Sequence, residues 1–415
     1  MTAKNIVTAP AMLGMLGGGQ LGRFFVIAAH ELGYQVTVLD PDKNSPAGKI
    51  ADVHICTNFD DAAALKKMAE TCQAVTTEFE NVPAKSLEML AITTTVMPSA
   101  SCVAIAQHRV LEKNFIKDAG LPVAPFVVIN NVSDLPADNS PLYPAILKVA
   151  RFGYDGKGQS RVKTKAEAAS AFAEFNNETC VLEQMMLLDL EVSVVLARDE
   201  QGNIAAFPTT ENSHLNGILD FSIVPARCSE VIKANAQELA KKLAQKLDYV
   251  GVLGVEFFVV GKQLLVNEIA PRPHNSGHYT IDACVTSQFE QQVRVMTGLP
   301  LGNADLHSNA VMVNILGDSW VNDAEPAWNK ACSHANLKLH LYGKFDPRKA
   351  RKMGHFTVIG KNKKAILNVA LILDVGMEAR AFGIDAPLGA RVGRYHDGQA
   401  LLLGNHVEYL HEPGE

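Results

Sequence analysis

Two glutamates in the middle of the chain could share a divalent cation. Glu256 and Glu268 lie in apolar segments on either side of a turn at Gly261-Lys262. A hairpin with a three-residue loop at 261–263 would place them directly opposite each other, whereas a two-residue loop would shift the pairing by one. Facing carboxylates repel, so a counter-charge such as Mg²⁺ bound to phosphate oxygens is expected, with Asn267 as a further oxygen ligand. The alternative is two solvated carboxylates, although neighbouring apolar residues indicate a buried sheet.

A lysine and a glycine-rich loop form a candidate phosphate site. Lys148 lies in the strand-like segment 145–149, and Gly153-Tyr154-Asp155-Gly156-Lys157-Gly158-Gln159 follows it. Glycines let backbone N–H groups close on phosphate oxygens without obstruction by Cβ atoms. The loop lacks the Walker A sequence, and a hairpin turn at Asp155-Gly156 is the competing interpretation. The preceding lysine favours phosphate binding.

A second glycine pattern, Gly17-x-Gly19-x-x-Gly22, follows a short apolar run and opens a helical segment. Asp40 ends the next strand-like segment, where the acid of a dinucleotide site would bind a ribose. Glycines are also needed simply to pack a helix tightly on a strand. Gln20 and Arg23 at the start of the helix could equally meet another anionic ligand. The pattern alone leaves these alternatives open.

The segment 270–279 is dense in hydrogen-bond donors and poor in packing residues, which suggests an anionic ligand. His274 and His278 have the spacing of a zinc pair on a helix, but the prolines and glycine of this segment disfavour a helix. A basic stretch at 344–352 is typical of a solvated face. Its value as a site rises because other segments already indicate phosphate binding.

The periodicity of the chain predicts the elements that position these residues. Strand-like and helical runs alternate in the first segment, which predicts a doubly wound parallel sheet. The strand-like runs are 12–16, 35–39, 74–77 and 93–97, and the helical runs are 24–32, 60–71 and 83–90. Prolines and polar residues between 119 and 144 indicate a linker. Short strands and an amphipathic helix at 231–247 follow, which predicts an α+β segment, and a strand at 310–316 opens the remainder.

Length and composition limit the class of protein. The 415 residues predict two or three domains, which we place at 1–115, 116–305 and 306–415. Apolar residues at 47% and charged residues at 20% are typical of a soluble globular protein and exclude a disordered chain or a membrane bundle. A net charge of −6 argues against a nucleic-acid binder. Seven dispersed cysteines without a C-x-x-C pair favour a reducing cytosol, and no export signal is expected.

Five motifs in order resemble the 5-(carboxyamino)imidazole ribonucleotide synthase family of the ATP-grasp superfamily, and the similarity covers most of residues 12–358. The motifs are Gly19-Gln20-Leu21-Gly22-Arg23, Thr77-Glu78-Phe79-Glu80-Asn81-Val82-Pro83, Gly153 to Gln159, Asn267-Glu268-Ile269-Ala270-Pro271-Arg272 with His274-Asn275-Ser276-Gly277-His278, and Lys352-Met353-Gly354-His355. Their order makes the resemblance specific, whereas no single motif would. Residues beyond about 359 carry little of it.

The resemblance implies the ATP-grasp architecture: an N-terminal doubly wound domain, a central ATP-grasp domain and a smaller C-terminal domain that closes over the site. It also implies that ATP phosphorylates bicarbonate to carboxyphosphate, which carboxylates the exocyclic amine of 5-aminoimidazole ribonucleotide. ATP and two Mg²⁺ ions are the implied cofactors. A cytoplasmic homodimer without nucleic-acid or membrane partners is expected.

The resemblance further implies site residues by matching position. The ATP contacts are Arg109, Lys148, Gly153, Tyr154, Asp155, Gly156, Lys157, Gly158, Gln159, Glu183, Gln184, Met185, Met186, Glu191, His214, Phe258, Asn267 and Glu268, with Glu191 on the ribose. The substrate contacts are Gln20, Glu78, Tyr154, Asp155, Lys157, Arg272, His274, Asn275, Ser276, Lys344, Arg351 and Lys352. Catalytic roles fall on Lys148, Asp155, Lys157, Arg272, His274 and Lys352, and the metal ligands are Glu256 and Glu268.

Three other functions compete with this one. A formate-dependent glycinamide ribonucleotide transformylase shares the domain order but usually carries an acid where Gln20 stands. A nicotinamide-dependent dehydrogenase would use the Gly17 to Gly22 pattern and leave the glutamate pair unexplained. An inactive nucleotide-binding regulator would tolerate the loss of a metal ligand, yet Lys148 and both glutamates are present.

Overall fold

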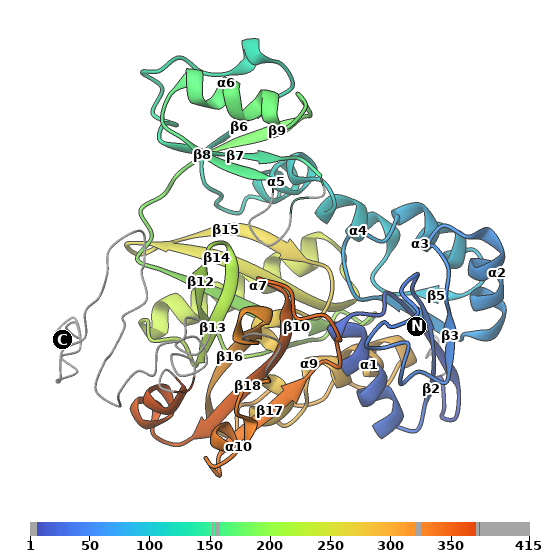
Figure 1. Cartoon of the computed structure of the whole chain (residues 1–415). Helices are drawn as coiled ribbons and strands as arrows, with labels where there is room; N and C mark the ends of the chain where they lie inside the picture. The colour runs from blue at the N-terminus through green and yellow to red at the C-terminus, as the bar shows by residue number, and fades with distance from the viewer. Residues whose placement is uncertain (1–5, 152, 154–157, 321–324, 371–372, 374–415) are drawn as a thin grey trace.

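The computed structural model describes residues 6–151, 153, 158–320, 325–370 and 373. The described residues form three sheets, which Figure 1 shows as an N-terminal unit, a small unit standing above the centre of the molecule, and a large central sheet. The N-terminal unit lies to one side of the central sheet in this view, and the small unit lies above it.

The N-terminal sheet is parallel, with strand order β3-β2-β1-β4-β5, as the alternation of elements predicted. Its strands are β1 (Met12–Leu16), β2 (Gln35–Leu39), β3 (Val53–Ile55), β4 (Ala74–Thr77) and β5 (Thr95–Val96). Its helices are α1 (Gln20–Glu31), α2 (Ala62–Thr71) and α3 (Ala84–Ala91). Helix α1 begins four residues before the predicted start, and β5 is shorter than the predicted 93–97. Strand order reverses between β1 and β4, and ligands of such sheets bind at this switch point.

The small unit is a four-stranded antiparallel sheet of order β6-β9-β7-β8, covered by helix α6 (Figure 1). Its strands are β6 (Phe126–Ile129), β7 (Ala145–Val149), β8 (Gln159–Val162) and β9 (Cys180–Gln184), and α6 spans Lys165–Glu174. Thr164 caps α6, because its side chain accepts a hydrogen bond from the backbone N–H of Glu167. Strands β7 and β9 pair with each other, so Lys148 and Glu183 belong to neighbouring strands.

The central sheet has nine strands and runs β15-β14-β10-β12-β13-β16-β18-β17, with β11 beside β10. The strands are β10 (Leu190–Arg198), β11 (Ile204–Ala206), β12 (Thr210–Leu215), β13 (Ile218–Val224), β14 (Gly251–Val260), β15 (Gln263–Ala270), β16 (Asn309–Leu316), β17 (Leu337–Leu341) and β18 (Lys352–Gly360). Strand β13 precedes residue 305, where we place a domain boundary, and β16 follows it. The two strands nevertheless pair in one sheet. The division at 115 and 305 stays a prediction.

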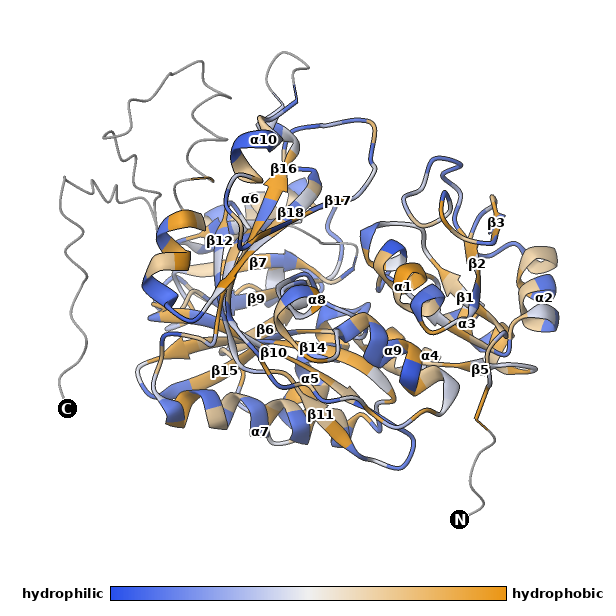
Figure 2. Ribbon diagram, turned by 90° about the horizontal axis from the view of Figure 1, so that it is seen from below, coloured by the Kyte–Doolittle hydropathy of each residue, from blue (hydrophilic) through white to orange (hydrophobic). Residues whose placement is uncertain are grey.

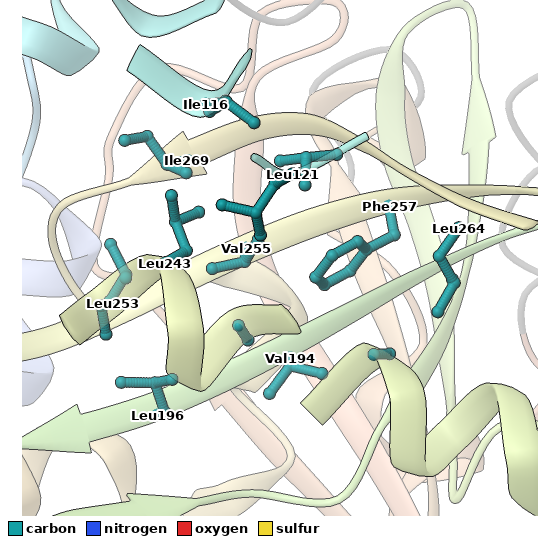
Figure 3. Close-up of a cluster of buried hydrophobic side chains, with 14 of the residues drawn as sticks. Ile116, Leu121, Val194, Leu196, Leu243, Leu253, Val255, Phe257, Leu264 and Ile269 are labelled. Atoms are coloured by element: carbon teal, nitrogen blue, oxygen red, sulfur yellow. The ribbon is translucent and has the colours of Figure 1, made fainter. Parts of the chain in front are cut away.

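One face of the central sheet is a hydrophobic core. Helix α7 (Glu230–Lys246) packs on alternate residues of β10 and β14, including Val194, Val255 and Phe257 (Figure 3). Because successive strand residues point to opposite faces, their neighbours Ser193 and Glu256 face the other way. In Figure 2 many of the central strands are coloured as hydrophobic, whereas the helices carry both hydrophilic and hydrophobic residues. Helix α7 therefore covers only the apolar face of β10 and β14, and the opposite face carries Ser193 and Glu256.

The remaining helices join these units. They are η1 (Val132–Asp134), α4 (Ala100–Ala106), α5 (Arg109–Asp118), η2 (Asn275–Gly277), α8 (Thr280–Ala283), α9 (Gln288–Thr297), η3 (Gly317–Ser319) and α10 (Trp328–Ala331). Helix α9 packs on α1 through Phe289, Val293 and Met296, so the N-terminal unit shares a core with the central one. None of the described helices combines the length and apolar character that crossing a bilayer requires.

Candidate active site

The two glutamates of the hairpin face each other, as predicted, but for a different reason. The turn has two residues, Gly261 and Lys262, so that Val260 pairs with Gln263. A register shift between Glu256 and Phe257 then restores the pairing of Glu256 with Glu268. A bulge in this position re-aims side chains and is common beside functional sites.

The environment of the pair suits a divalent cation. Burial and the nearby Glu268 raise the pKa of Glu256 to about 7. Asn267 donates from Nδ2 to Glu256 Oε2 at 3.3 Å, and its own Oδ1 is buried without a hydrogen-bond partner among the described residues. Two carboxylates and an unpartnered amide oxygen form the hard-oxygen ligand set that Mg²⁺ prefers. Glu268 also contacts Arg109 Nη1 at 3.3 Å.

Lys148 belongs to a buried cluster of three charges. Its Nζ atom lies 3.2 Å from Glu183 Oε1, and Lys113 Nζ of α5 lies 2.7 Å from Glu183 Oε2. Burial opposes ionisation of Glu183, but the two lysines outweigh it and lower its pKa to about 2. Burial lowers the pKa of Lys148, and Glu183 counteracts this. The cluster carries an excess positive charge beside Arg109 and would attract phosphate.

We expect Glu183→Gln to lower the free energy of unfolding by about 3 kcal/mol at pH 7, since it leaves two buried ammonium groups without their counter-charge. The folded-state pKa of Glu183 is depressed, so its contribution is present above pH 4.5 and is lost as the pH falls toward about 2. Thermal unfolding midpoints between pH 2 and pH 7 test both points. The exposed Glu178→Gln is the control, and equal midpoints for the two variants would contradict the expectation.

Another ion pair lies on the face of the central sheet that carries Glu256. His214 Nδ1 of β12 lies 2.9 Å from Glu191 Oε2 of β10. Burial would lower the pKa of His214, but Glu191 and the more distant carboxylates raise it to about 9, so the imidazole is charged. Phe258 lies opposite Glu191 in the register of β10 and β14. These residues, predicted as ATP contacts, therefore lie together.

The end of β9 and the two residues after it were also predicted as ATP contacts. Gln184 is the last residue of β9, and the backbone N–H of Met185 donates to the carbonyl of Pro144 at 2.9 Å. Met186 is half-buried. The backbone N–H of Met185 is thus used in pairing with the residue before β7, and the contact of this segment with ATP stays a prediction.

The glycine-rich loop joins β7 to β8. Gly158 has φ +70°, and a Cβ there would meet Val149 Cγ2 at 2.6 Å, so this position requires glycine. Gln159 begins β8 and pairs with Lys148. Gly153 is described, whereas the predicted site residues Tyr154, Asp155, Gly156 and Lys157 lie outside the described residues.

The donor-rich segment after β15 reaches both the glutamate pair and the N-terminal unit. Arg272 Nε lies 2.7 Å from Glu80 Oε2, and His274 Nε2 lies 3.3 Å from Glu256 Oε1. Burial would raise the pKa of Glu80, but Arg272 outweighs it and the net shift is downward. Asn275 is buried, and neither its Oδ1 nor its Nδ2 has a hydrogen-bond partner among the described residues. An orphaned buried amide beside cationic groups points to a polar ligand.

Two lysines of the basic stretch also reach this region. Lys344 Nζ donates to Gln20 Oε1 at 2.8 Å and to the carbonyl of Lys352 at 2.7 Å. Arg351 lies further out, where its Nη1 donates to the carbonyl of Asp346 at 2.8 Å. The structure therefore brings Gln20, Lys344 and Lys352 together and gives Arg351 a partner within its own loop.

The backbone N–H groups of the glycine pattern in the N-terminal unit donate to a buried glutamate, so they are not available to a ligand phosphate. Glu78 is buried, and its carboxylate accepts from the backbone N–H groups of Gly19 and Gly22, the latter at 2.7 Å. A Cβ at Gly17 would meet Glu78 Cγ at 2.3 Å. The carboxylate occupies the N-terminal end of α1, where the pyrophosphate of a dinucleotide would bind. The dinucleotide interpretation of this pattern has no support in the geometry.

His278 is not part of a zinc pair with His274, because the segment between them forms the short 3-10 helix η2. Instead, His278 packs beside His355, whose ring stacks on that of His340. His340 Nε2 lies 2.8 Å from Asp282 Oδ2, and Tyr342 Oη lies 3.0 Å from His355 Nδ1. These side chains join α8 to β17 and β18 next to α1. This cluster was not predicted from the sequence, although His278 and His355 belong to quoted motifs. Glu80 also lies in a quoted motif, but its contact with Arg272 was not predicted, and Lys113 lies in no motif.

Matches to known proteins cover most of the chain. Family models match a ribonucleotide synthetase preATP-grasp domain at residues 11–107, an ATP-grasp domain at 114–289 and a phosphoribosylaminoimidazole carboxylase C-terminal domain at 310–368. Together with the three sheets and the glutamate pair, they define an ATP-grasp enzyme. The chain belongs to the N5-carboxyaminoimidazole ribonucleotide synthase family, as its relatives show.

Two relatives and two structures illustrate this membership. The N5-carboxyaminoimidazole ribonucleotide synthase of Bacillus subtilis is 44% identical over 86% of this chain and 93% of its own, and that of Brucella melitensis is 44% identical over 86% and 98%. An ADP complex of such a synthetase is 40% identical, with a TM-score of 0.85 over 91% of this chain and 99% of the other. The Aspergillus clavatus enzyme, solved with ADP and 5-aminoimidazole ribonucleotide, is 32% identical, with a TM-score of 0.83 over 89% and 99%.

Proposed function

We propose that this chain uses ATP and bicarbonate to carboxylate 5-aminoimidazole ribonucleotide through carboxyphosphate. As a member of its family, it converts this ribonucleotide to N5-carboxyaminoimidazole ribonucleotide with ATP, in purine biosynthesis. A bicarbonate oxygen attacks the γ-phosphorus, and ADP leaves. The exocyclic amine then attacks the carboxyl carbon, phosphate leaves, and one proton of the amine is lost. The observation that carries the proposal is the facing pair Glu256 and Glu268, beside which Asn267 Oδ1 has no hydrogen-bond partner in the described part of the chain.

The charges of the site match this chemistry. Phosphoryl transfer depends on positioning and on neutralisation of the phosphate oxygens more than on covalent help. Lys148 and Arg109 would contact the phosphates. Glu191, which is held by His214, would contact the ribose hydroxyls. Glu256, Glu268 and Asn267 would hold Mg²⁺, which would supply the remaining positive charge between the phosphates. The other ATP contacts implied by resemblance belong to the same proposal.

The ribonucleotide would bind between the N-terminal unit and the segment after β15. The ammonium of Lys344 lies beside Gln20, and the charge of Lys352 is close enough to His274 to help lower the pKa of that imidazole. Both lysines would supply cationic charge for the phosphate of the ribonucleotide. Glu80 holds Arg272 Nε, and Arg272 Nη1 donates to the carbonyl of Pro273 at 3.1 Å, so the remaining donors of the guanidinium, those of Nη2 among them, would meet a substrate oxygen. The orphaned amide of Asn275 would satisfy its hydrogen bonds on the ligand. Glu78 is held by the α1 N-terminus, so we propose that it shapes the pocket and orders the glycines near residue 19.

We further propose that the enzyme works as a homodimer in the cytoplasm. All seven cysteines are free, which suits a reducing compartment. The division into units at 1–115, 116–305 and 306–415 is proposed on the same footing, and the matched domain ranges lie within it apart from a few residues before 116.

The function is tested by measuring ADP release with Mg-ATP, bicarbonate and 5-aminoimidazole ribonucleotide, and in mixtures that omit each one. Rapid release is expected only in the complete mixture, because the imidazole amine consumes the carboxyphosphate. Release that requires formate and glycinamide ribonucleotide would instead identify the related transformylase and overturn the proposal. Thermal stabilisation by NAD but not by Mg-ATP would favour a dehydrogenase.

A further inference from the structure

A row of buried hydroxyl and amide groups crosses the central sheet and ends at His274. Ser222 of β13 donates to Asn212 Oδ1 of β12, and Asn212 Nδ2 donates to Ser193 Oγ of β10. The Ser193 hydroxyl donates to Ser276 Oγ, which lies 2.8 Å from His274 Nδ1. Each of the three preceding links is also 2.8 Å long. All five side chains are at most 9% exposed, so water does not compete for these bonds.

The direction of this row is fixed at its imidazole end. The backbone N–H of Ser276 points at His274 Nδ1 from 3.3 Å, and a backbone amide can only donate, so Nδ1 carries a lone pair. The Ser276 hydroxyl has one proton, which it gives to Nδ1, because its oxygen already accepts from Ser193. Ser193 gives its one proton to Ser276, so it accepts from the NH₂ group of Asn212, and the Asn212 carbonyl oxygen is turned toward the Ser222 hydroxyl, which donates to it. Every link therefore runs toward the imidazole.

We propose that Ser222, Asn212, Ser193 and Ser276 form a directional hydrogen-bond chain that holds His274 as its Nε2–H tautomer, with that proton directed at Glu256. The first three are positioning residues, because they reach the site only through Ser276 and His274. The role of the chain in turnover rests on the proposed function, whereas the tautomer itself does not.

The tautomer matters because of what His274 faces. Its Nε2 lies 3.3 Å from Glu256 Oε1, while Asn267 Nδ2 donates to Glu256 Oε2 at the same distance. In the Nε2–H form, both oxygens of Glu256 face donors, which orients the carboxylate opposite Glu268. The Nδ1–H form would set its Nδ1 proton against the backbone N–H of Ser276, and it would set the Nε2 lone pair against an ionised Glu256. Since Nδ1 accepts and Nε2 donates, His274 orients Glu256 and is not the group that accepts the amine proton of the substrate.

The tautomer is read directly from the imidazole nitrogen shifts of ¹⁵N-histidine-labelled enzyme without ligands, with His274→Gln identifying the signals. We expect a pyridine-like Nδ1 and a pyrrole-like Nε2 in the unsubstituted enzyme. A pyrrole-like Nδ1 would overturn the proposal without any variant. Ser193→Ala removes the hydroxyl that donates to Ser276. The Ser276 hydroxyl could then accept a hydrogen bond from Nδ1–H of His274, so we expect averaged nitrogen shifts from a mixture of the two tautomers. Ser222→Ala, which lets the Asn212 amide turn, is expected to act in the same direction.

Thr357→Val is the matched control, because Thr357 of β18 carries a fully buried hydroxyl that does not belong to the hydrogen-bond chain. It should leave the His274 shifts unchanged, and unchanged shifts in Ser193→Ala as well would overturn the proposal. We expect Ser193→Ala to lower kcat about tenfold while the KM for ATP changes less than about twofold. If the unsubstituted enzyme shows no ribonucleotide-dependent ADP release, the proposed function fails, and the nitrogen shifts still decide the tautomer.

Discussion

Replacing Glu268 by glutamine is expected to lower kcat/KM for ATP by about 10³-fold, because it removes one of the two carboxylates proposed to hold the divalent cation. Glutamine keeps the size of the side chain and the position of the strand opposite Glu256. The side chain of Glu268 is 41% exposed, so little packing is lost and the fold should persist. Initial rates of ADP release at varied Mg-ATP give the value.

The stability of the same variant separates a lost ligand from a damaged fold. Glu268 repels Glu256 and attracts Arg109, so its neutralisation should leave the thermal unfolding midpoint of the ligand-free enzyme nearly unchanged. Glu290→Gln, which breaks an ion pair with Arg294 within helix α9, is the control and should keep full activity. A Glu268→Gln enzyme within about fivefold of full activity would show that this carboxylate binds no essential cation.

Lys148→Met is expected to raise the KM for ATP and lower kcat, with a combined loss of about 10²-fold to 10³-fold in kcat/KM. The substitution removes an ammonium group from the buried cluster, while Lys113 remains 2.7 Å from Glu183 and keeps that carboxylate paired. Methionine fills similar volume, so β7 should still pair with β9. Steady-state kinetics and ATP-induced thermal shifts measure the loss.

The control for Lys148 is Lys163, an exposed lysine that follows strand β8 of the same unit. Lys163→Met should bind and turn over ATP as the unsubstituted enzyme does. If Lys148→Met keeps an unchanged ATP-induced shift in its unfolding midpoint, the lysine only balances Glu183 and does not contact the nucleotide.

The elements were predictable because their patterns are local. The parallel N-terminal strands, α7 and the β14–β15 hairpin follow from alternation or helical spacing within a few residues. The hairpin also shows the limit of such patterns. The pairing of Glu256 with Glu268 was predicted from a three-residue loop, yet a two-residue turn and a bulge produce it. A bulge depends on contacts on both faces of a sheet, and no signal at these positions in the sequence indicates one.

Partners that meet across large sequence distances were not predictable from the residues alone. Lys113 reaches Glu183 from α5 and lies in no motif. Glu80 reaches Arg272 from the N-terminal unit, and the motif that contains Glu80 does not indicate this partner. The buried pair Asn212 and Ser222 lies in strands without special composition. Burial decides the strength of such contacts, and burial is set by how the sheets pack. A polar residue at a strand position that alternation assigns to a buried face is the one signal that could have indicated them.

The central claim, that ATP activates bicarbonate for transfer to the ribonucleotide amine, is tested most directly with ¹⁸O-labelled bicarbonate. Attack of a bicarbonate oxygen on the γ-phosphorus, followed by loss of phosphate from the carboxyl carbon, transfers one labelled oxygen to phosphate for each ADP formed. Mass analysis of the phosphate from the complete reaction should therefore show a single ¹⁸O from the label. Phosphate without the label, released at the rate of ADP formation, would contradict the account.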